Sequence, residues 1–152
     1  MLAILDTAVV HGLRGELVRV EVDITNGLPV FSIVGLPDAA LSEARERVRG
    51  ALRTTGFESP LSRITVNRAP AHRRKSGAAY DDAIAVGILL ANQQIRASGG
   101  PRALRGELSL DGSVRSVPGV RPMVATLQAA GHGRVCVPTA SVDEAALVEG
   151  IE

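Results

Sequence analysis

The segment from about residue 81 to residue 94 carries apolar side chains nearly all the way round a helical cycle. A surface helix of a globular protein has a polar face toward water, whereas a helix that is apolar on every side is buried. The sequence therefore predicts a buried helix here, enclosed by the other elements of the chain.

The first third of the chain has the patterns of strands, at residues 2–10, 16–24 and 30–34. Apolar side chains largely alternate within 16–24, which is typical of a strand with one buried face. Asn26-Gly27 lies between the second and third strands and predicts a hairpin turn, because both residues tolerate positive φ angles. A further strand is predicted over residues 62–69.

A helix is predicted to begin at Pro37 and Asp38 and to end at Gly56. Its apolar residues recur at helical spacing: Leu41, Ala44, Val48, Ala51 and Leu52. The opposite side is charged and is interpreted as a solvated, internally paired surface rather than a partner-binding one. It holds Glu43, Arg45, Glu46, Arg47, Arg49 and Arg53.

The second half of the chain predicts a hairpin of strands 104–110 and 113–117 across Asp111-Gly112. A helix over 120–130, a short strand over 134–137 and a helix beginning near Ser141 follow. Because strands gather early and helices are interleaved later, the predicted class is α+β, as a single domain over residues 1–152.

Composition limits the core and the electrostatic functions. Aromatic residues make up only 2% of a chain that is 45% hydrophobic, so the core must be aliphatic. The 17 basic and 16 acidic side chains nearly cancel, and no global field attracts nucleic acid or a membrane. Cys136, the single cysteine, is predicted to be a small buried apolar side chain. With no signal segment or membrane span, the expected location is cytoplasmic.

The sequence lacks the residues that phosphate binding and metal binding require, and it gives no support for a catalytic triad. A phosphate-binding loop needs glycines ahead of Lys-Ser, but Ala69 and Arg74 occupy those places before Lys75-Ser76. His11, His72 and His132 are far apart and lack partners at ligand spacing, so no metal site is expected. Spacing alone leaves a serine–histidine–carboxylate triad open, although nothing in the sequence supports one.

A basic segment is the main candidate for binding. It holds Arg68, His72, Arg73, Arg74 and Lys75. Arginine and lysine supply most contacts to phosphates, so Arg68, Arg73, Arg74 and Lys75 are candidate DNA contacts. The few aromatic rings offer little stacking for single strands. The same segment could instead face another protein surface, or be a basic surface turn.

Several motifs stand out: Gly27-Leu28-Pro29, Ile33-Val34-Gly35-Leu36-Pro37-Asp38, Glu43-Ala44-Arg45-Glu46-Arg47-Val48-Arg49, Arg63-Ile64-Thr65-Val66-Asn67 and Gly106-Glu107-Leu108-Ser109-Leu110-Asp111-Gly112. Together they resemble the opening domain of the magnesium-chelatase-like AAA+ ATPases of the ComM/YifB family. The resemblance implies a Lon-protease-type, ribosomal-protein-like fold in which helices pack on a mixed sheet. It implies an AAA+ domain downstream, absent from this chain, which would take ATP and Mg.

The same resemblance implies work in DNA processing, including branch migration and natural transformation. The implied partners are the AAA+ domain, ring neighbours and DNA, with no membrane and no small-molecule substrate. Related chains usually have leucine at position 68 and aspartate at position 72, so Arg68 and His72 add positive charge here.

The resemblance to Lon-type proteases also bears on catalysis. Their serine–lysine dyad corresponds here to Ala79 and Arg121. Arginine stays protonated and cannot act as the base, so the implied domain is non-catalytic. The alternatives are a protein-binding adaptor and a cryptic serine peptidase that uses Ser76 with Lys75.

Overall fold

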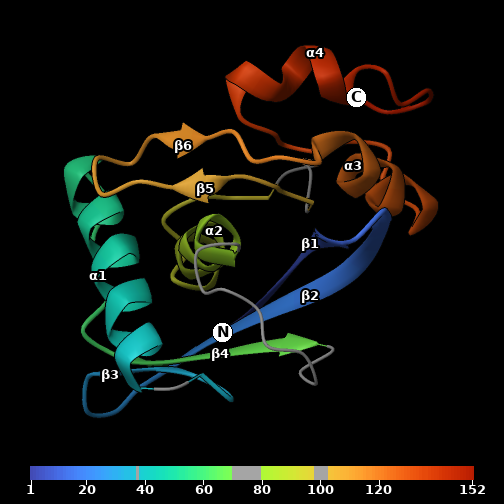
Figure 1. The fold of residues 1–152 in the computed structure, drawn as a ribbon. Coiled ribbons are helices and arrows are strands. Elements are labelled where there is room, and N and C mark those ends of the chain that lie inside the picture. The colour runs from blue at the N-terminus through green and yellow to red at the C-terminus, as the bar shows by residue number, and fades with distance from the viewer. Residues whose placement is uncertain (37, 70–79, 98–102) are drawn as a thin grey trace.

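A computed structural model describes residues 1–36, 38–69, 80–97 and 103–152 (Figure 1). A four-stranded sheet has the order β1-β2-β4-β3, and β5 and β6 form a separate hairpin. The strands are β1 (Leu2–His11), β2 (Arg14–Thr25), β3 (Val30–Ile33), β4 (Arg63–Ala69), β5 (Glu107–Leu108) and β6 (Val114–Arg115). The helices are α1 (Asp38–Thr54), α2 (Asp81–Ala91), α3 (Val120–Ala129), the 3-10 turn η2 (Thr139–Ser141) and α4 (Val142–Ala145). The predicted α+β class is confirmed.

The prediction of a hairpin between β2 and β3 at Asn26-Gly27 is wrong. Gly27 does have a positive φ of 150°, but β4 lies between β2 and β3. Helix α1 carries the chain back, so that β4 pairs parallel to β3 and antiparallel to β2. The hairpin at the start of the chain joins β1 to β2, and Gly12, with a φ of 63°, forms its turn.

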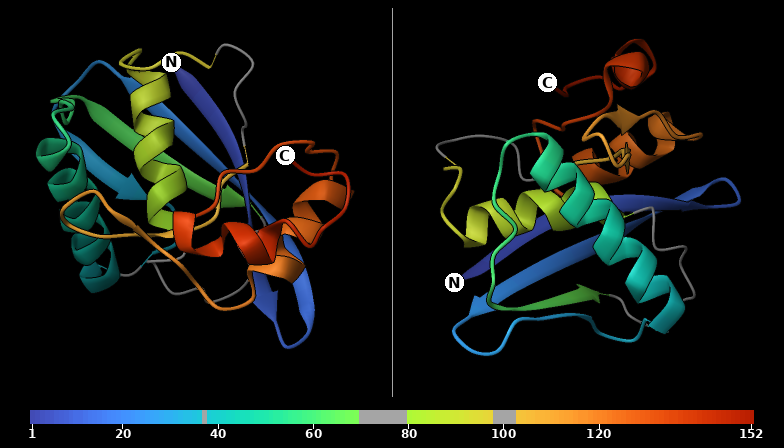
Figure 2. Two further views of the ribbon diagram at one scale, coloured as in Figure 1. Left: turned by 90° about the horizontal axis from the view of Figure 1, so that it is seen from above. Right: turned by 90° about the vertical axis from the view of Figure 1, so that its left-hand side faces the viewer.

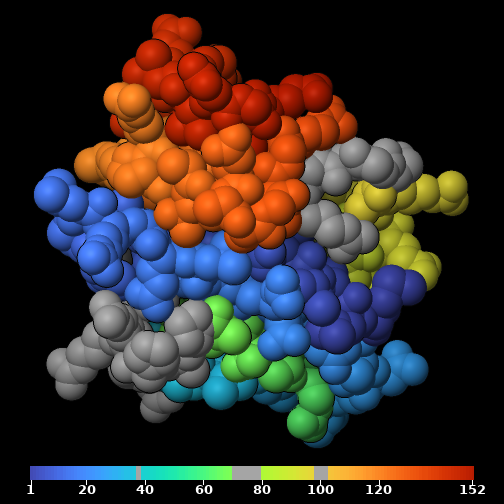
Figure 3. Space-filling model, turned by 90° about the vertical axis from the view of Figure 1, so that its right-hand side faces the viewer, coloured from blue at the N-terminus to red at the C-terminus, as the bar shows by residue number. Residues whose placement is uncertain are grey.

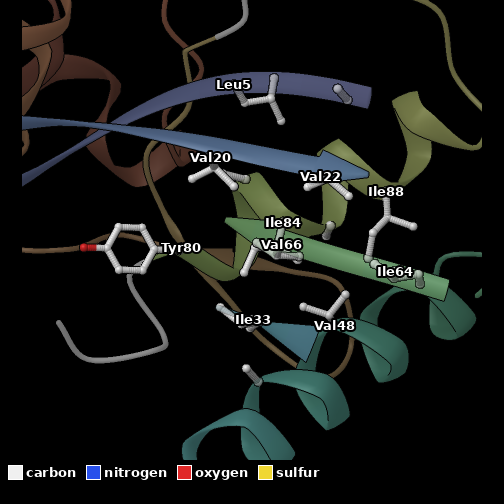
Figure 4. Packing of buried hydrophobic residues seen from close by; sticks show 14 of the residues in the cluster. Leu5, Val20, Val22, Ile33, Val48, Ile64, Val66, Tyr80, Ile84 and Ile88 are labelled. Carbon is white, nitrogen blue, oxygen red and sulfur yellow. The ribbon is translucent and has the colours of Figure 1, made fainter. Parts of the chain in front are cut away.

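Helix α2 is buried as predicted, although it ends at Ala91 rather than residue 94. It lies on one face of the sheet, with α1 beside it and the β5–β6 hairpin on its far side (Figures 1 and 2). Gly87 permits the close approach, since a Cβ there would lie 2.5 Å from Val22 Cγ2. The core around α2 is aliphatic apart from two rings, as Figure 4 illustrates. Its labelled members include Leu5, Val20, Val66, Ile84 and Ile88.

Helix α3 covers the opposite face of the sheet at the β1–β2 end. Met123 and Leu127 pack there with Ala8. In Figure 3 the orange segment, which includes α3, lies against the blue strands. Asp6 of β1 has a buried carboxylate. Its Oδ1 accepts a hydrogen bond of 3.0 Å from Arg19 Nε, and its Oδ2 lies 2.8 Å from His132 Nε2. Burial acts to raise the pKa of Asp6, but the Arg19 and His132 contacts outweigh it, and the pKa is lowered.

Two expectations for the C-terminal third need correction. Residues 134–137 form no strand, because only Cys136 makes a bridge, to Leu104. Cys136 is exposed rather than buried and lines an apolar pocket of about 430 Å³ with Val124 and Val137. The Cys136 backbone N–H donates to the Ala103 carbonyl, and its carbonyl accepts from the Arg105 N–H. The β5–β6 hairpin is confirmed, with shorter strands than predicted. No helix within the described ranges is long and apolar enough to cross a bilayer.

Substitution of Gly15 by alanine is expected to lower the free energy of unfolding by about 1–3 kcal/mol. The added Cβ would lie 1.9 Å from Thr126 Oγ1 and 2.9 Å from the Pro122 carbonyl oxygen, forcing α3 away from β2. Denaturant unfolding measures the change. Gly133→Ala is the control, because a Cβ at Gly133 meets nothing within 4 Å. Equal stabilities for the two variants would contradict this account of the contact.

Candidate functional site

Charged side chains and one tyrosine, from four segments of the chain, meet at the start of α2. We call this set the arginine–aspartate cluster: Arg47, Arg68, Tyr80, Asp81, Asp82 and Arg105. The pair Asp81-Asp82 occupies the first turn of α2, where negative charge is favoured by the helix dipole. Asp82 Oδ1 accepts a hydrogen bond of 2.8 Å from the Ala83 backbone N–H. Both carboxylates are buried, and they therefore depend on arginines for charge compensation.

Asp81 is fully buried and is paired with Arg47 of α1. Arg47 Nε donates a hydrogen bond to Asp81 Oδ2, while Asp81 Oδ1 has no hydrogen-bond partner among the described atoms. Burial raises the pKa of Asp81, and Arg47 opposes part of that rise. The interpretation of the charged α1 side as solvated is therefore wrong for Arg47, which also lies 3.8 Å from Glu43.

Asp82 and Arg105 form the second pairing of charges. Burial raises the pKa of Asp82 to about 7, against the attraction of Arg105. Burial likewise lowers the pKa of Arg105, which Asp82 opposes. Arg105 Nε also lies 2.8 Å from Met123 Sδ, so this arginine links the start of α2 to α3.

Arg68 and Tyr80 complete the cluster. The Arg68 guanidinium lies 5.0 Å from the centre of the Tyr80 ring, a cation–π contact. Tyr80 is 1% exposed, and burial raises its pKa to about 12. In Figure 4 its ring lies at the edge of the core with the hydroxyl pointing away. Arg68 shares the core-facing side of β4 with Ile64 and Val66, and is half-buried.

The basic segment predicted to contact phosphate is thus placed only in part. Arg68 lies in the arginine–aspartate cluster, and Arg73, Arg74 and Lys75 lie outside the described residues. DNA binding by this segment remains a prediction.

The two dyad positions are also placed only in part. Ala79 falls outside the described ranges, immediately before Tyr80. Arg121 is exposed at the start of α3, and its backbone N–H donates to Glu144 Oε1 at 3.4 Å.

The chemistry of the cluster is that of internal charge compensation. A carboxyl with a pKa near 7 can in principle transfer a proton. However, Asp82 is only 6% exposed and lines a small, mostly apolar pocket of about 190 Å³. Ligand sites are usually cavities of about 300–1,000 Å³. The cluster is therefore better suited to positioning α1, α2 and α3 than to binding a substrate.

The described histidines lie apart. His11 Nε2 is 2.9 Å from Glu16, and His132 pairs with Asp6. Among residues 1–36, 38–69, 80–97 and 103–152, no three His, Cys, Asp or Glu side chains gather closely enough to hold a metal ion.

The hydrogen bond from Arg47 to Asp81 and the attraction between Arg105 and Asp82 were not predicted from the sequence. The signal that could have found them is Asp81-Asp82 at the start of a helix predicted to be buried. Two carboxylates at that place require cationic partners from other elements.

These features define a class of protein. It is an α+β domain in which arginines compensate the buried carboxylates at the start of a buried helix. Residues 20–141 match the family described as subunit ChlI of Mg-chelatase, and the chain belongs to this family. More particularly, it corresponds to the N-terminal part of YifB/ComM proteins.

Three relatives illustrate the match. Competence protein ComM of Haemophilus influenzae is 40% identical over 148 residues, or 97% of the chain. YifB of Escherichia coli is 39% identical over 98% of the chain. An uncharacterized protein of Mycobacterium tuberculosis is 46% identical over 94% of the chain. The matched part is 29% of the length of each of these relatives.

Proposed function

We propose that this chain is a non-catalytic domain of a ring-forming magnesium-chelatase-like AAA+ ATPase, and that it serves as a scaffold contacting DNA or a protein partner. The proposal includes a Lon-type fold, a cytoplasmic location and a role in DNA processing, such as branch migration during natural transformation. ATP and Mg would be bound by the ATPase domain of the full-length protein. The similarity to competence protein ComM across 97% of the chain supports this assignment.

The observation that carries the proposal is the pairing of charges at the start of α2. In a Lon-type protease the nucleophile would directly precede this helix, at the position of Ala79. Here, Asp81 is bonded to Arg47, and Arg105 lies near Asp82 and Tyr80. Arg121 replaces the lysine base and stays protonated at any accessible pH. These features favour a scaffold over a peptidase.

The isolated chain is expected to hydrolyse neither labelled casein nor ATP above the rate of a heat-treated sample. The physical reason is that a protonated Arg121 cannot activate a nucleophile and that the sequence lacks a glycine-rich phosphate loop. Release of labelled peptides and of phosphate are the measurements, with Ser76→Ala and Ser59→Ala as matched variants. Casein turnover that Ser76→Ala abolishes and Ser59→Ala leaves intact would establish the cryptic peptidase instead.

A further inference from the structure

A groove separates the C-terminal half of α1 from the segment that leads to β4. Its volume is about 540 Å³, within the range of ligand-binding pockets. The right-hand view of Figure 2 faces this side of the molecule, where the segment descends from the end of α1 to β4. The groove is lined by Pro29, Arg49, Arg53, Phe57, Ser59, Pro60 and Leu61.

Two cations, Arg49 and Arg53, line the groove, and the described residues that line it include no carboxylate. Arg49 and Arg53 are one helical turn apart on α1, so their side chains lie on the same face. Within the described ranges neither forms an ion pair, whereas neighbouring Arg45 and Arg47 lie within 4.0 Å of Glu46 and Glu43. The other described residues of its lining are uncharged. The groove therefore has an excess of positive charge that complements an anionic partner.

Exposed aliphatic side chains accompany these arginines. Leu61 is 84% exposed in the groove wall, and Leu28, next to Pro29, is 79% exposed. Phe57 is also exposed, at 36%. Single exposed apolar residues are ordinary, but a group of them around a groove is typical of an interaction site.

We infer that this groove binds an acidic segment of a partner protein, with aliphatic side chains of that segment between α1 and Leu61. The arginines would pair with carboxylates, and the prolines and leucine would contact the apolar side chains. A nucleic acid fits less well, because among the described residues of the groove lining only the Phe57 ring could stack on a base. Protein–DNA interfaces are also more polar than protein–protein interfaces, whereas exposed apolar side chains surround this groove.

Fluorescence anisotropy with the 152-residue chain tests the inference. The probe is a fluorescein-labelled acidic peptide with a central pair of leucines, compared with the same peptide carrying serines there and with labelled oligothymidylate. The leucine peptide is expected to bind, and more weakly as salt is added. Arg49→Ala combined with Arg53→Ala should weaken it about fivefold or more, since two exposed ion pairs are lost. Leu61→Ser should also weaken it.

The matched controls lie at the β1–β2 turn. Leu13 is 97% exposed and Arg14 is exposed, so Leu13→Ser and Arg14→Ala remove the same kinds of side chain elsewhere. They should leave peptide affinity unchanged. Thermal unfolding by circular dichroism verifies that each variant is folded.

The outcomes separate this groove from the basic segment. Arg73→Ala, Arg74→Ala and Lys75→Ala combined should leave peptide affinity unchanged, whatever they do to oligothymidylate. Equal binding of the serine peptide, or undiminished binding by the groove variants, would overturn the inference. It would also fail if oligothymidylate bound in place of the peptide and the groove variants abolished that binding.

Discussion

Replacement of Arg47 by methionine is expected to lower the free energy of unfolding by about 3–5 kcal/mol, because it leaves a buried carboxylate without its partner. Asp81 is fully buried, and Arg47 supplies the hydrogen bond to Oδ2. Methionine keeps much of the apolar volume of the arginine stem, so the loss measures the charge rather than a cavity. Denaturant unfolding at neutral pH gives the value.

A double-mutant cycle isolates this pair. Asp81→Asn combined with Arg47→Met should recover part of the stability, since no unpaired charge then remains buried. Arg53→Met is the matched control, because Arg53 is exposed on the same helix. If Arg47→Met costs no more than Arg53→Met, the Arg47–Asp81 bond does not stabilise the domain.

Relative to the parent chain, the Asp82→Asn variant is expected to gain stability as pH rises from about 4 to about 7. Burial raises the pKa of Asp82 from 3.8 to about 7, so between these values the folded state binds more protons than the unfolded state. The contribution of Asp82 to stability therefore falls as pH rises from about 4 to about 7. This rise in the pKa corresponds to a loss of roughly 4 kcal/mol of stability over the same pH range. Asparagine does not titrate, and the variant lacks this fall.

The measurement is the difference in unfolding free energy between Asp82→Asn and the parent chain across that pH range. The asparagine side-chain oxygen can still accept the hydrogen bond from the Ala83 N–H, so the end of α2 is preserved. Asp143→Asn, at an exposed site in α4, is the control and should show little change in this difference. A difference for Asp82→Asn that is flat with pH would mean that Asp82 is ionised in the fold without cost.

Local patterns were sufficient for most elements of the fold. Apolar side chains on every side of α2 predicted its burial. Gly56, with a φ of 84°, follows the end of α1 at the place where the sequence predicted it. The pairing of the strands could not be predicted from local sequence patterns. Asn26-Gly27 has the residues of a tight turn, yet the position of β4 depends on the crossover through α1 and not on those two residues.

The candidate site was harder to predict than the fold. Charge spacing on α1 distinguished an apolar side from a charged one, but gave no reason to separate Arg47 from Arg49 or Arg53. Only the packing of α1 beside α2 makes that distinction, because it brings Arg47 to Asp81. Cys136 was likewise misplaced, since an apolar run does not reveal which of its side chains the neighbouring backbone turns outward.

The position of Asp6 has a consequence for the order in which the domain can form during synthesis. Its strand pairs with β2, which follows directly in the chain, and Arg19 lies within that hairpin. Ala103 and His132, which complete its surroundings, are added much later. Until α3 has been made, Ala8 and Val10 of β1 lack the Met123 and Leu127 side chains that pack with them in the complete fold. A nascent chain that stops before α3 therefore exposes apolar strand surface, which favours aggregation.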